Sequence, residues 1–412
     1  MPHAVKLAAF VGLACVAVSA CGPLSASADL QTLPAQQQSR ASVVAVPSGP
    51  GKVAPSERVV VTARNGQLAS VSVVGPHGKQ LTGSFSPDGA TWTADASALD
   101  YASTYSVAAT AVDSRGLPVT TRESFTTARP DKVFSAWVSP AQGSVVGVGM
   151  PISVGFDRDI AVEDRDAVEK ALVVRTSTPL VGAWSWTGPR EVRFRPVAYW
   201  PANSQVQVQA DLTGVKLADG AMGSGNSTAS FAIGPSMVTK VDAVTHQASV
   251  FRDGSLIKTI PVTTGKPGFE TRSGTVVITT KEPVRVMDAA TGGTDTTDPE
   301  YYRIEVRWAM RITATGEFLH AAPWSVYAQG KRNVSHGCVG MSTDNAQWLF
   351  DRSNIGDVVE ISGTPVQQNL GNGVTVWMNT WDEWLADSAV GPIATQALDP
   401  AIAPVTIPAS TA

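Results

Sequence analysis

The sequence predicts a mainly β protein made of several consecutive domains, and three observations support this fold class. Ala, Val, Thr, Ser and Gly dominate the composition, and runs rich in Val and Thr are repeatedly broken by Gly and Pro, as is typical of strands and turns. At 412 residues the chain is long enough to bury more than one core. The pattern of residues 96–125 returns at 195–231, which indicates two tandem modules of one kind.

Charged residues are sparse, at 16% of the chain, and the net charge is only −4. Nucleic-acid binding requires a strongly basic surface, so the composition excludes this class of partner. Beyond the N-terminal segment, no apolar run approaches the roughly 18 residues that span a bilayer. We therefore expect no other membrane-spanning segment.

Residues 1–20 are predicted to be a lipoprotein signal peptide. Lys6 precedes an apolar run at 7–18 that is too short for a comfortable membrane span, and Val18-Ser19-Ala20-Cys21 follows directly. These last four residues match the bacterial lipobox, which implies cleavage before Cys21 and lipid attachment to its sulfur. The alternative is an ordinary signal peptide with an incidental cysteine. The lipobox interpretation predicts an exported protein, lipid-anchored to the outer face of the plasma membrane.

Residues 21–52 are predicted to form a flexible tether, because Ser, Ala, Gln, Pro and Gly prevail there and large apolar residues are almost absent. Residues 53–130 and 131–235 are predicted to be two immunoglobulin-like β-sandwich modules. In the first, short alternating runs are separated by turn signals such as Asn65-Gly66. Neither module has a polar cluster suited to catalysis, so both are expected to act as spacers.

Four aromatic residues of the second module allow two interpretations. Trp184, Trp186, Tyr199 and Trp200 either pack in its core, the commoner fate of such residues, or line a face that stacks on sugars. The sequence leaves both possibilities open.

A third β-rich unit is predicted at 236–363. Alternating runs at 238–242 and 248–252, with the turn Asp253-Gly254, predict a hairpin that continues into a third strand. Later segments of this unit are also predicted to be strands or a helix: strands at 276–280, 284–287, 302–308, 317–320 and 357–361, and a helix at 343–350.

Cys338 is the one cysteine left for chemistry, because Cys15 and Cys21 belong to the targeting segment. An unpaired thiol in an exported protein is a liability unless it is used. The ordinary alternative is a small buried apolar residue. Export without a partner cysteine favours a nucleophile.

A nucleophilic cysteine needs a base, and either His320 or His336 can be argued from the sequence. His246 is assigned no role. The backbone N–H groups of Gly337, Cys338 or Val339 can be proposed as an oxyanion hole. A zinc site with both histidines and the cysteine as ligands is an alternative, although no carboxylate lies close by in sequence to support it.

The sequence Ser335-His336-Gly337-Cys338, with His320 upstream and Ala322-Pro323-Trp324-Ser325-Val326 between them, closely resembles the catalytic signature of L,D-transpeptidases of the YkuD fold. It is most similar to the mycobacterial enzymes that carry immunoglobulin-like domains and a Trp-rich C-terminal subdomain. The resemblance covers about residues 238–385 and implies that 236–363 is the catalytic domain.

The resemblance implies a role for each matching residue. Cys338 would be the nucleophile and His320 its base, while His336 and Gly337 belong to the catalytic motif, with His336 ordering the loop. Five residues are implied to bind substrate: Tyr302, Met287, Trp324, Ser335 and Asn333. Among them, Tyr302 would lie over the thiol.

The reaction implied is transfer of a peptidoglycan tetrapeptide stem, with release of D-Ala, to the side-chain amine of another stem, which gives a 3→3 cross-link. No cofactor or metal is required. The implied partners are peptidoglycan stem peptides, carbapenem β-lactams as covalent inhibitors and a membrane reached through the lipid anchor. The alternatives are an L,D-carboxypeptidase or other hydrolase of the same stems, and a weakly catalytic peptidoglycan-binding structural lipoprotein.

Two positions depart from the family pattern. Gly340 stands where the family usually has Asn, and Ala321 stands where a Ser commonly follows the upstream histidine. A bond that orients His320 must then come from the backbone or from elsewhere. Both departures suggest reduced sensitivity to acylating β-lactams.

The segment 364–388 is predicted to be a Trp-rich subdomain. Trp377, Trp381 and Trp384 stand at i, i+4 and i+7, which places them on one face of a helix. We expect this face to pack on the catalytic domain, and glycan stacking is the alternative. The resemblance implies that the segment braces this domain against the preceding module. Residues 389–412 are rich in Pro and Ala and are predicted to be disordered.

Overall fold

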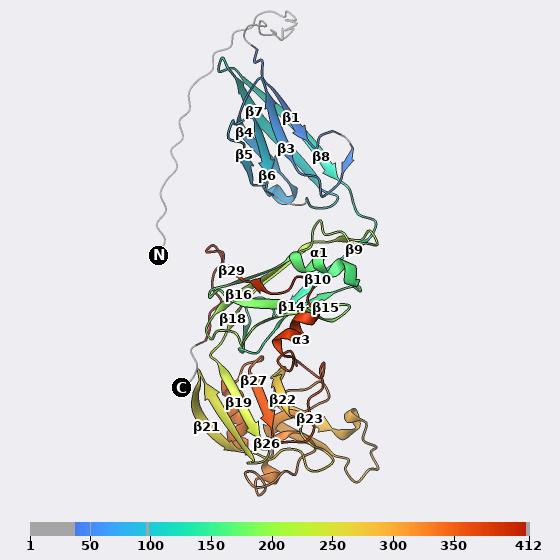
Figure 1. Ribbon diagram of the computed structural model, residues 1–412, viewed down its shortest axis with the longest axis vertical. Coiled ribbons are helices and arrows are strands. Elements are labelled where there is room, and N and C mark those ends of the chain that lie inside the picture. Colours follow the sequence, from blue (N-terminus) through green and yellow to red (C-terminus); the bar gives the residue numbers. More distant parts are fainter. Residues whose placement is uncertain (1–37, 50, 96–98, 409–412) are drawn as a thin grey trace, which may run out of the picture.

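The computed structural model describes residues 38–49, 51–95 and 99–408. Three β-rich units follow one another along the long axis of the molecule (Figure 1). The predicted signal peptide and Cys21 lie outside the described residues. No helix in the described ranges is both long and apolar enough to cross a membrane.

The first module is a sandwich of two four-stranded sheets, with the strand orders β1-β3-β6-β5 and β2-β8-β7-β4. Trp92, Tyr105 and Phe125 fill the space between the sheets. The strands are β1 (Ser42–Val46), β2 (Lys52–Val53), β3 (Val60–Arg64), β4 (Gly66–Val74), β5 (Gly83–Phe85), β6 (Thr91–Ala94), β7 (Thr104–Asp113) and β8 (Pro118–Thr127).

The predicted tether is wrong in its last part, because β1 and β2 belong to the first module. β1 pairs antiparallel with β3 along its whole length, and Ala45 is buried in the core. The alternation of small apolar residues at 42–46 matches the period of a strand with one buried face.

The second module contains two five-stranded sheets, with the orders β10-β12-β15-β14-β28 and β11-β18-β16-β13-β29, and a two-stranded sheet, β17-β9. Two of these strands, β28 (Ile393–Ala394) and β29 (Gln396–Ala397), come from the C-terminal tail. Tyr101 of the first module contacts it, since its hydroxyl donates to Gly223 O at 2.6 Å. The elements of this module that precede the third unit are β9 (Val133–Phe134), β10 (Ala136–Ser139), β11 (Val145–Val146), β12 (Ile152–Phe156), α1 (Arg165–Lys170), β13 (Leu172–Thr176), β14 (Val181–Gly188), β15 (Glu191–Pro196), β16 (Gln205–Asp211), β17 (Met222–Gly223) and β18 (Asn226–Ile233).

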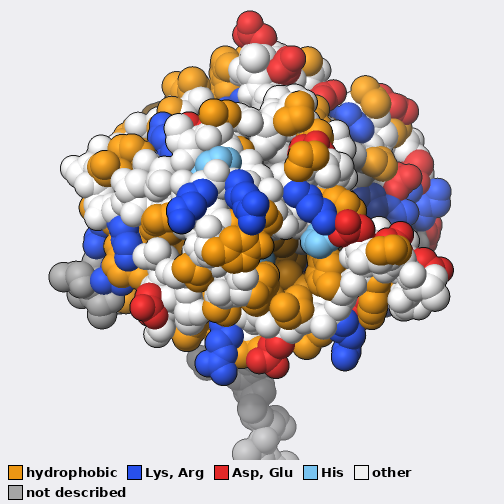
Figure 2. All heavy atoms as spheres, turned by 90° about the horizontal axis from the view of Figure 1, so that it is seen from below, with side chains coloured by type: hydrophobic (Ala, Val, Ile, Leu, Met, Phe, Trp, Pro, Cys, Tyr) orange, Lys and Arg blue, Asp and Glu red, His pale blue; other side chains and the backbone are white. Residues whose placement is uncertain are grey.

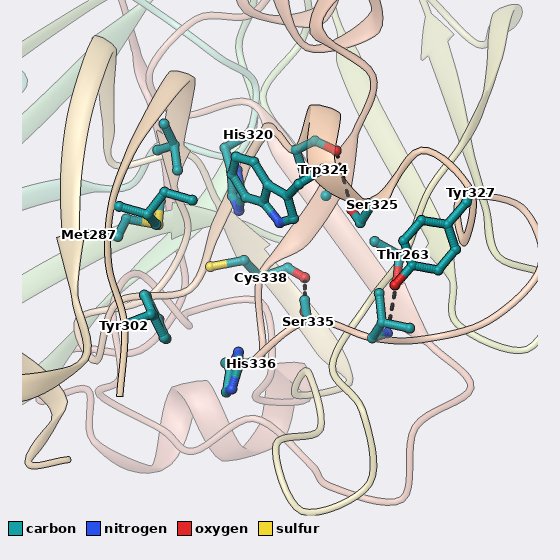
Figure 3. Close-up of a pocket in the computed structure, with 15 residues that line it drawn as sticks. Thr263, Met287, Tyr302, His320, Trp324, Ser325, Tyr327, Ser335, His336 and Cys338 are labelled. Carbon is teal, nitrogen blue, oxygen red and sulfur yellow. Dashed lines mark hydrogen bonds between the residues drawn. The ribbon is translucent and has the colours of Figure 1, made fainter. Parts of the chain in front are cut away.

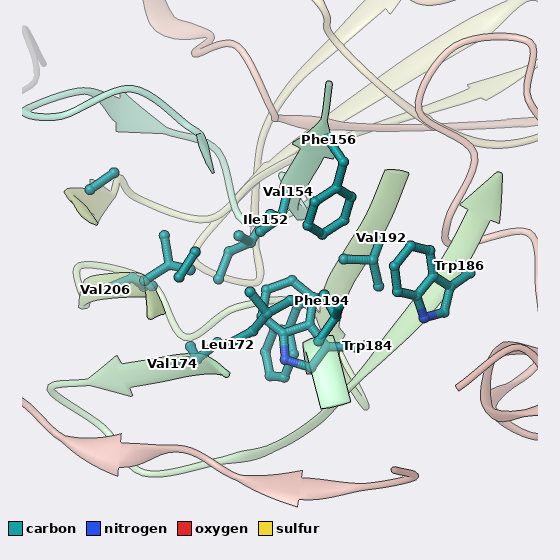
Figure 4. Close-up of a cluster of buried hydrophobic side chains, with 14 of the residues drawn as sticks. Ile152, Val154, Phe156, Leu172, Val174, Trp184, Trp186, Val192, Phe194 and Val206 are labelled. Atoms are coloured by element: carbon teal, nitrogen blue, oxygen red, sulfur yellow. The ribbon is translucent and has the colours of Figure 1, made fainter. Parts of the chain in front are cut away.

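Aromatic rings form the centre of the second module (Figure 4). Trp184, Trp186 and Trp200 are buried in this core, and the ring of Trp184 meets that of Phe194 edge to face. The core interpretation of these tryptophans is therefore confirmed. Tyr199 is only partly buried, and its hydroxyl donates to Glu360 Oε1 at 3.0 Å.

The C-terminal tail pairs with the second module through two short strands and through Val405, whose backbone bonds to Gln205, so the prediction of disorder from 389 is wrong for these parts. β28 (Ile393–Ala394) and β29 (Gln396–Ala397) each add a strand to one sheet of the second module. The buried carboxylate of Glu169 accepts hydrogen bonds from the backbone N–H groups of Ala389 and Val390, at 2.8 and 3.0 Å. The strand pairing and the Glu169 carboxylate thus supply hydrogen-bond partners for the backbone of the tail. The composition of the tail does not reveal these partners.

The Trp-rich segment forms a shorter helix than predicted. α3 (Trp381–Ala386) begins after Thr380, which forms a capping box with Glu383, and Trp377 lies outside it. All three tryptophan rings surround the Arg195 guanidinium of the second module, at 5.0 to 5.4 Å. The tryptophan face therefore packs on the second module, where the buried guanidinium attracts the rings, and not on the third unit as expected. The segment also contacts the third unit, since Met378 Sδ accepts from Thr275 N at 3.0 Å, so it braces the two units as the resemblance implies.

The third unit contains a five-stranded sheet, β21-β20-β19-β27-β22, and a four-stranded sheet, β23-β24-β25-β26. The predicted hairpin and the helix after Cys338 are both present, and the side chain of Ser342 caps that helix. The elements are β19 (Met237–Asp242), β20 (Gln247–Arg252), β21 (Ser255–Pro261), β22 (Gly274–Val277), β23 (Thr280–Asp288), β24 (Arg303–Arg311), β25 (Phe318–Ala321), β26 (Val339–Met341), α2 (Thr343–Arg352) and β27 (Val358–Ser362).

The second module docks closely on the third unit through glycines. Gly147 N donates to Ile355 O at 2.8 Å, and Gly149 N donates to Gly356 O at 2.9 Å. A Cβ atom at Gly147 would lie 2.2 Å from the backbone nitrogen of Asp357. Only glycine permits this approach of two backbones.

Candidate active site

Strand pairing brings Cys338 and His320 to one cavity. β25 and β26 run parallel, with Leu319 opposite Val339 and His320 opposite Gly340. Cys338 immediately precedes β26, so its side chain emerges next to the strand that carries His320 (Figure 3). Both side chains line a cavity of about 280 Å³.

The imidazole of His320 is oriented by a backbone carbonyl. Its Nδ1 lies 2.8 Å from Ala321 O, and because a carbonyl can only accept, Nδ1 carries the hydrogen and Nε2 is left to accept a proton. Burial lowers the pKa of His320 and keeps the ring neutral. The absence of a serine side chain at Ala321 therefore removes no orienting group. The bond that orients His320 comes from the backbone, which is one of the two sources predicted from the sequence.

The Cys338 thiol is buried, with 8% of the residue exposed. Burial raises its pKa to about 12; the backbone of Phe318 opposes this shift and the charge of Glu317 adds to it. The sulfur lies 3.8 Å from Gly316 O. The resting group is therefore a neutral thiol, which must lose its proton to a base as it attacks.

His336 is held by charged groups on two loops rather than by the thiol. Its Nε2 lies 2.6 Å from Glu300 Oε2, and the ammonium of Lys266 reaches the same oxygen at 2.6 Å. The rings of Phe269 and Tyr302 flank the imidazole, with centroids at 4.7 and 5.0 Å. This geometry favours His320 as the base of Cys338.

Gly337 forms a tight turn before the nucleophile. Its φ of 114° is in the region that only glycine adopts readily. Its N–H donates to Ser335 Oγ at 3.2 Å, and its carbonyl accepts from Thr271 Oγ1 at 2.7 Å. Because its N–H is engaged by Ser335, the proposal that Gly337 supplies an oxyanion donor is not supported by this geometry.

Comparison with known proteins finds the two kinds of domain that the sequence predicts. The model of the bacterial Ig domain matches residues 51–216, and that of the L,D-transpeptidase catalytic domain matches 237–361. The chain is 38% identical over 332 residues to L,D-transpeptidase 2 of Mycobacterium tuberculosis, covering 80% of each protein. The chain belongs to the L,D-transpeptidase family.

A second relative agrees with this assignment. L,D-transpeptidase 5 of Mycobacterium tuberculosis is 34% identical over 349 residues, with 82% of this chain and 75% of that protein covered. A solved L,D-transpeptidase in complex with imipenem is 35% identical, with 55% of this chain and 97% of that chain covered and a TM-score of 0.47. The two family models and the two relatives identify the chain as a cysteine-dependent transpeptidase with immunoglobulin-like and YkuD domains.

Four of the five residues expected to bind substrate line the thiol cavity of this transpeptidase: Met287, Tyr302, Trp324 and Ser335. Burial, followed by the charge of Cys338, raises the pKa of Tyr302, so its hydroxyl stays protonated. Trp324 is half exposed at the cavity.

Asn333, the fifth, is not among the cavity residues but braces the catalytic loop. Its Oδ1 accepts from Thr264 N at 3.1 Å and lies 3.0 Å from His246 Nδ1, while its Nδ2 donates to Ala243 O at 2.9 Å. These bonds occupy the amide and give Asn333 a bracing role, while its contact with substrate stays a prediction. His246, which was assigned no role, is part of this brace.

Gly340 removes bulk from the cavity wall. A Cβ at this position would lie 3.0 Å from Ala322 Cβ and 3.2 Å from Thr263 Cγ2, so a larger residue requires both neighbours to shift. The transpeptidase therefore has a wall without a side chain where the family pattern places an amide. Thr263 itself lines the cavity, and no motif in the sequence marked it.

A second cavity, of about 790 Å³, adjoins the first and shares Met287, Tyr302 and His336 with it. Figure 2 shows this end of the molecule, where a hollow opens beside a histidine side chain and Lys and Arg side chains lie along its edge. Arg272 lines the second cavity and pairs with the buried Glu317 at 3.1 Å. Within the described part of the chain, no three His, Cys, Asp or Glu side chains cluster as a metal site would require.

Proposed function

We propose that this transpeptidase forms 3→3 cross-links between peptidoglycan stems. The donor is a tetrapeptide stem, and Cys338 attacks the carbonyl of its third residue, meso-diaminopimelate. D-Ala leaves, and the side-chain amine of a second stem takes over the acyl group. The observation that carries this proposal is the shared cavity of Cys338 and His320, with His320 Nδ1 bonded to Ala321 O.

The first half of the reaction follows from these two groups. Nε2 of His320 takes the proton from the thiol as the S–C bond forms, so the thiolate exists only during attack. The imidazolium then gives this proton to the departing D-Ala nitrogen as the C–N bond breaks, which leaves a thioester and a neutral histidine. Tyr302, with a pKa raised by burial, can donate a hydrogen bond to the developing oxyanion.

A lipid anchor and the two modules would determine where this chemistry takes place. The signal peptide and lipobox at Cys21 support an exported enzyme held at the outer face of the plasma membrane. The segment from Cys21 to β1 would serve as the tether, shorter than the sequence predicts, and the first module would hold the active site away from the membrane. Carbapenems would acylate Cys338, because the same thiol attack opens a β-lactam ring.

The test is to incubate the mature chain with disaccharide-tetrapeptides and to identify the products by mass. Dimers that have lost one D-Ala are expected, and Cys338→Ala should form none. Tripeptides without dimers would instead identify an L,D-carboxypeptidase. Equal product formation by Cys338→Ala and the unmodified chain would overturn the assignment of the nucleophile.

A further inference from the structure

His336 is bonded at one ring nitrogen and open at the other. Lys266, followed by His336, lowers the pKa of Glu300 through hydrogen bonds, so Glu300 is a charged acceptor. Its Oε2 lies 2.6 Å from His336 Nε2. A carboxylate can only accept, so Nε2 carries the hydrogen, and in the neutral ring it is Nδ1 that presents the lone pair.

Nδ1 has no hydrogen-bond partner among the residues described, and the ring of His336 lines both cavities. The ring is fixed from several sides, by Phe269 and Tyr302 as well as by Glu300. A held imidazole with one carboxylate-bound nitrogen and one open nitrogen is the arrangement of a general base.

The transfer half of the reaction requires such a base. An amine of the lysine type has a pKa of roughly 10, so the acceptor is mostly protonated at neutral pH and must shed protons before and during amide formation. His320 is buried on the β25 side, where it serves the thiol. His336 is more open, with 28% of its side chain exposed, and borders the second cavity from which an acceptor can approach.

We propose that His336, oriented by Glu300, is the base that takes the proton of the acceptor amine, while His320 serves Cys338. In this step the amine nitrogen attacks the thioester carbonyl, the C–N bond forms and the C–S bond breaks. Before the attack, the ammonium form of the acceptor gives one proton to Nδ1 of His336, which later releases it to water. During the attack the nitrogen loses a second proton, which passes to the departing Cys338 thiolate. Glu300 is a positioning residue that stabilises the imidazolium. The inference rests on the proposed cross-linking function.

The experiment separates the two half-reactions in the mature chain carrying Glu300→Gln. The Gln side chain can still accept from Nε2–H, but its charge is lost. Acylation of Cys338 by imipenem should stay within about twofold, whereas dimer formation should fall by roughly tenfold or more. Release of the stem acyl-enzyme by hydroxylamine, whose amine is already unprotonated at neutral pH, should be unchanged. Glu305→Gln, an exposed glutamate on β24, is the matched control.

Three results would overturn the inference: a parallel fall of imipenem acylation and dimer formation, no change in either, or equal losses with hydroxylamine and with the stem amine. The first would reduce Glu300 to a structural support. His336→Gln is the second variant and should reproduce the split between the two acceptors. If the unmodified chain forms no dimers, the proposed function and this inference fall together; if only the split is missing, the proposed function stands.

Discussion

His320 and His336 both line the cavity that holds Cys338, but the chain holds the two imidazoles by different means. His320 lies within a strand, is 5% exposed, and is oriented by the carbonyl of the next residue. His336 lies in a loop and is oriented by Glu300 and Lys266, which come from two other loops. On the strand side of the cavity, burial keeps the His320 imidazole neutral and able to act as a base. On the loop side, charged partners order the His336 ring but leave it accessible.

The largest effect is expected from removing His320, the base on the strand side. In His320→Gln, acylation of Cys338 by a β-lactam should fall by roughly 10²–10⁴, because the buried thiol loses the group that takes its proton. Stopped-flow kinetics with mass detection of the adduct measures this. A larger loss of acylation in His336→Gln than in His320→Gln would reverse the assignment of the two sides.

The second largest effect is expected from acid, which protonates His320 and so lowers the acylation rate. Burial lowers the pKa of His320 below its ordinary 6.5, so the acid limb of acylation should lie below pH 6.5, with up to about tenfold loss per pH unit beneath it. The folded pKa is below the unfolded one, so the associated stability is present above about pH 6.5 and is lost as the pH falls through the folded value. An acid limb above pH 6.5 in the acylation rate would contradict a buried neutral base.

The turn on the loop side is sensitive to a single methyl group. Gly337→Ala places a Cβ at a φ of 114°, at a cost of roughly 1–3 kcal/mol, and should lower activity by displacing the thiol. Gly292→Ala, where a Cβ meets no atom within 4 Å, is the control and should be neutral. Thermal unfolding and acylation rates measure both variants; equal behaviour of the two would remove the claim that the turn requires glycine.

The loop brace is expected to affect stability more than substrate affinity. Asn333→Ala removes the bonds to Thr264, His246 and Ala243 and should reduce the free energy of unfolding by about 1–3 kcal/mol. Asn369→Ala, an exposed position, is the matched control. Denaturant titration with KM for the donor stem distinguishes the two roles: unchanged stability with a raised KM would favour the predicted substrate contact over the brace.

The smallest effect is expected at Ala321. Because the carbonyl of this residue and not its side chain orients His320, Ala321→Ser should change the acylation rate by less than about twofold, a difference of roughly 0.4 kcal/mol. Side-by-side imipenem kinetics on the two proteins suffices. A tenfold gain in the serine variant would mean that the side chain has an orienting role which the backbone does not replace.

The nucleophile could be predicted from the sequence, the choice of His320 as its base came only with the family resemblance, and the partners of His336 could not be predicted. Cys338 and His320 belong to a local motif and a periodic strand, and the hairpin and α2 follow from alternation and capping. Lys266 and Glu300 meet His336 only through the fold, and an ion pair between distant loops leaves no periodic pattern. The same reason explains the errors at β1, in the tail and at Arg195, where a segment's partner, rather than its own composition, decides whether it is ordered and where it packs.

The most direct test of the strand-side account is the ultraviolet titration of the Cys338 thiolate, with Cys338→Ala as the blank. Burial raises the thiol pKa to about 12 and keeps His320 neutral. We therefore predict no thiolate signal at neutral pH and its appearance only under strongly alkaline conditions. A thiolate already present at pH 7, paired with a protonated His320, would contradict the account.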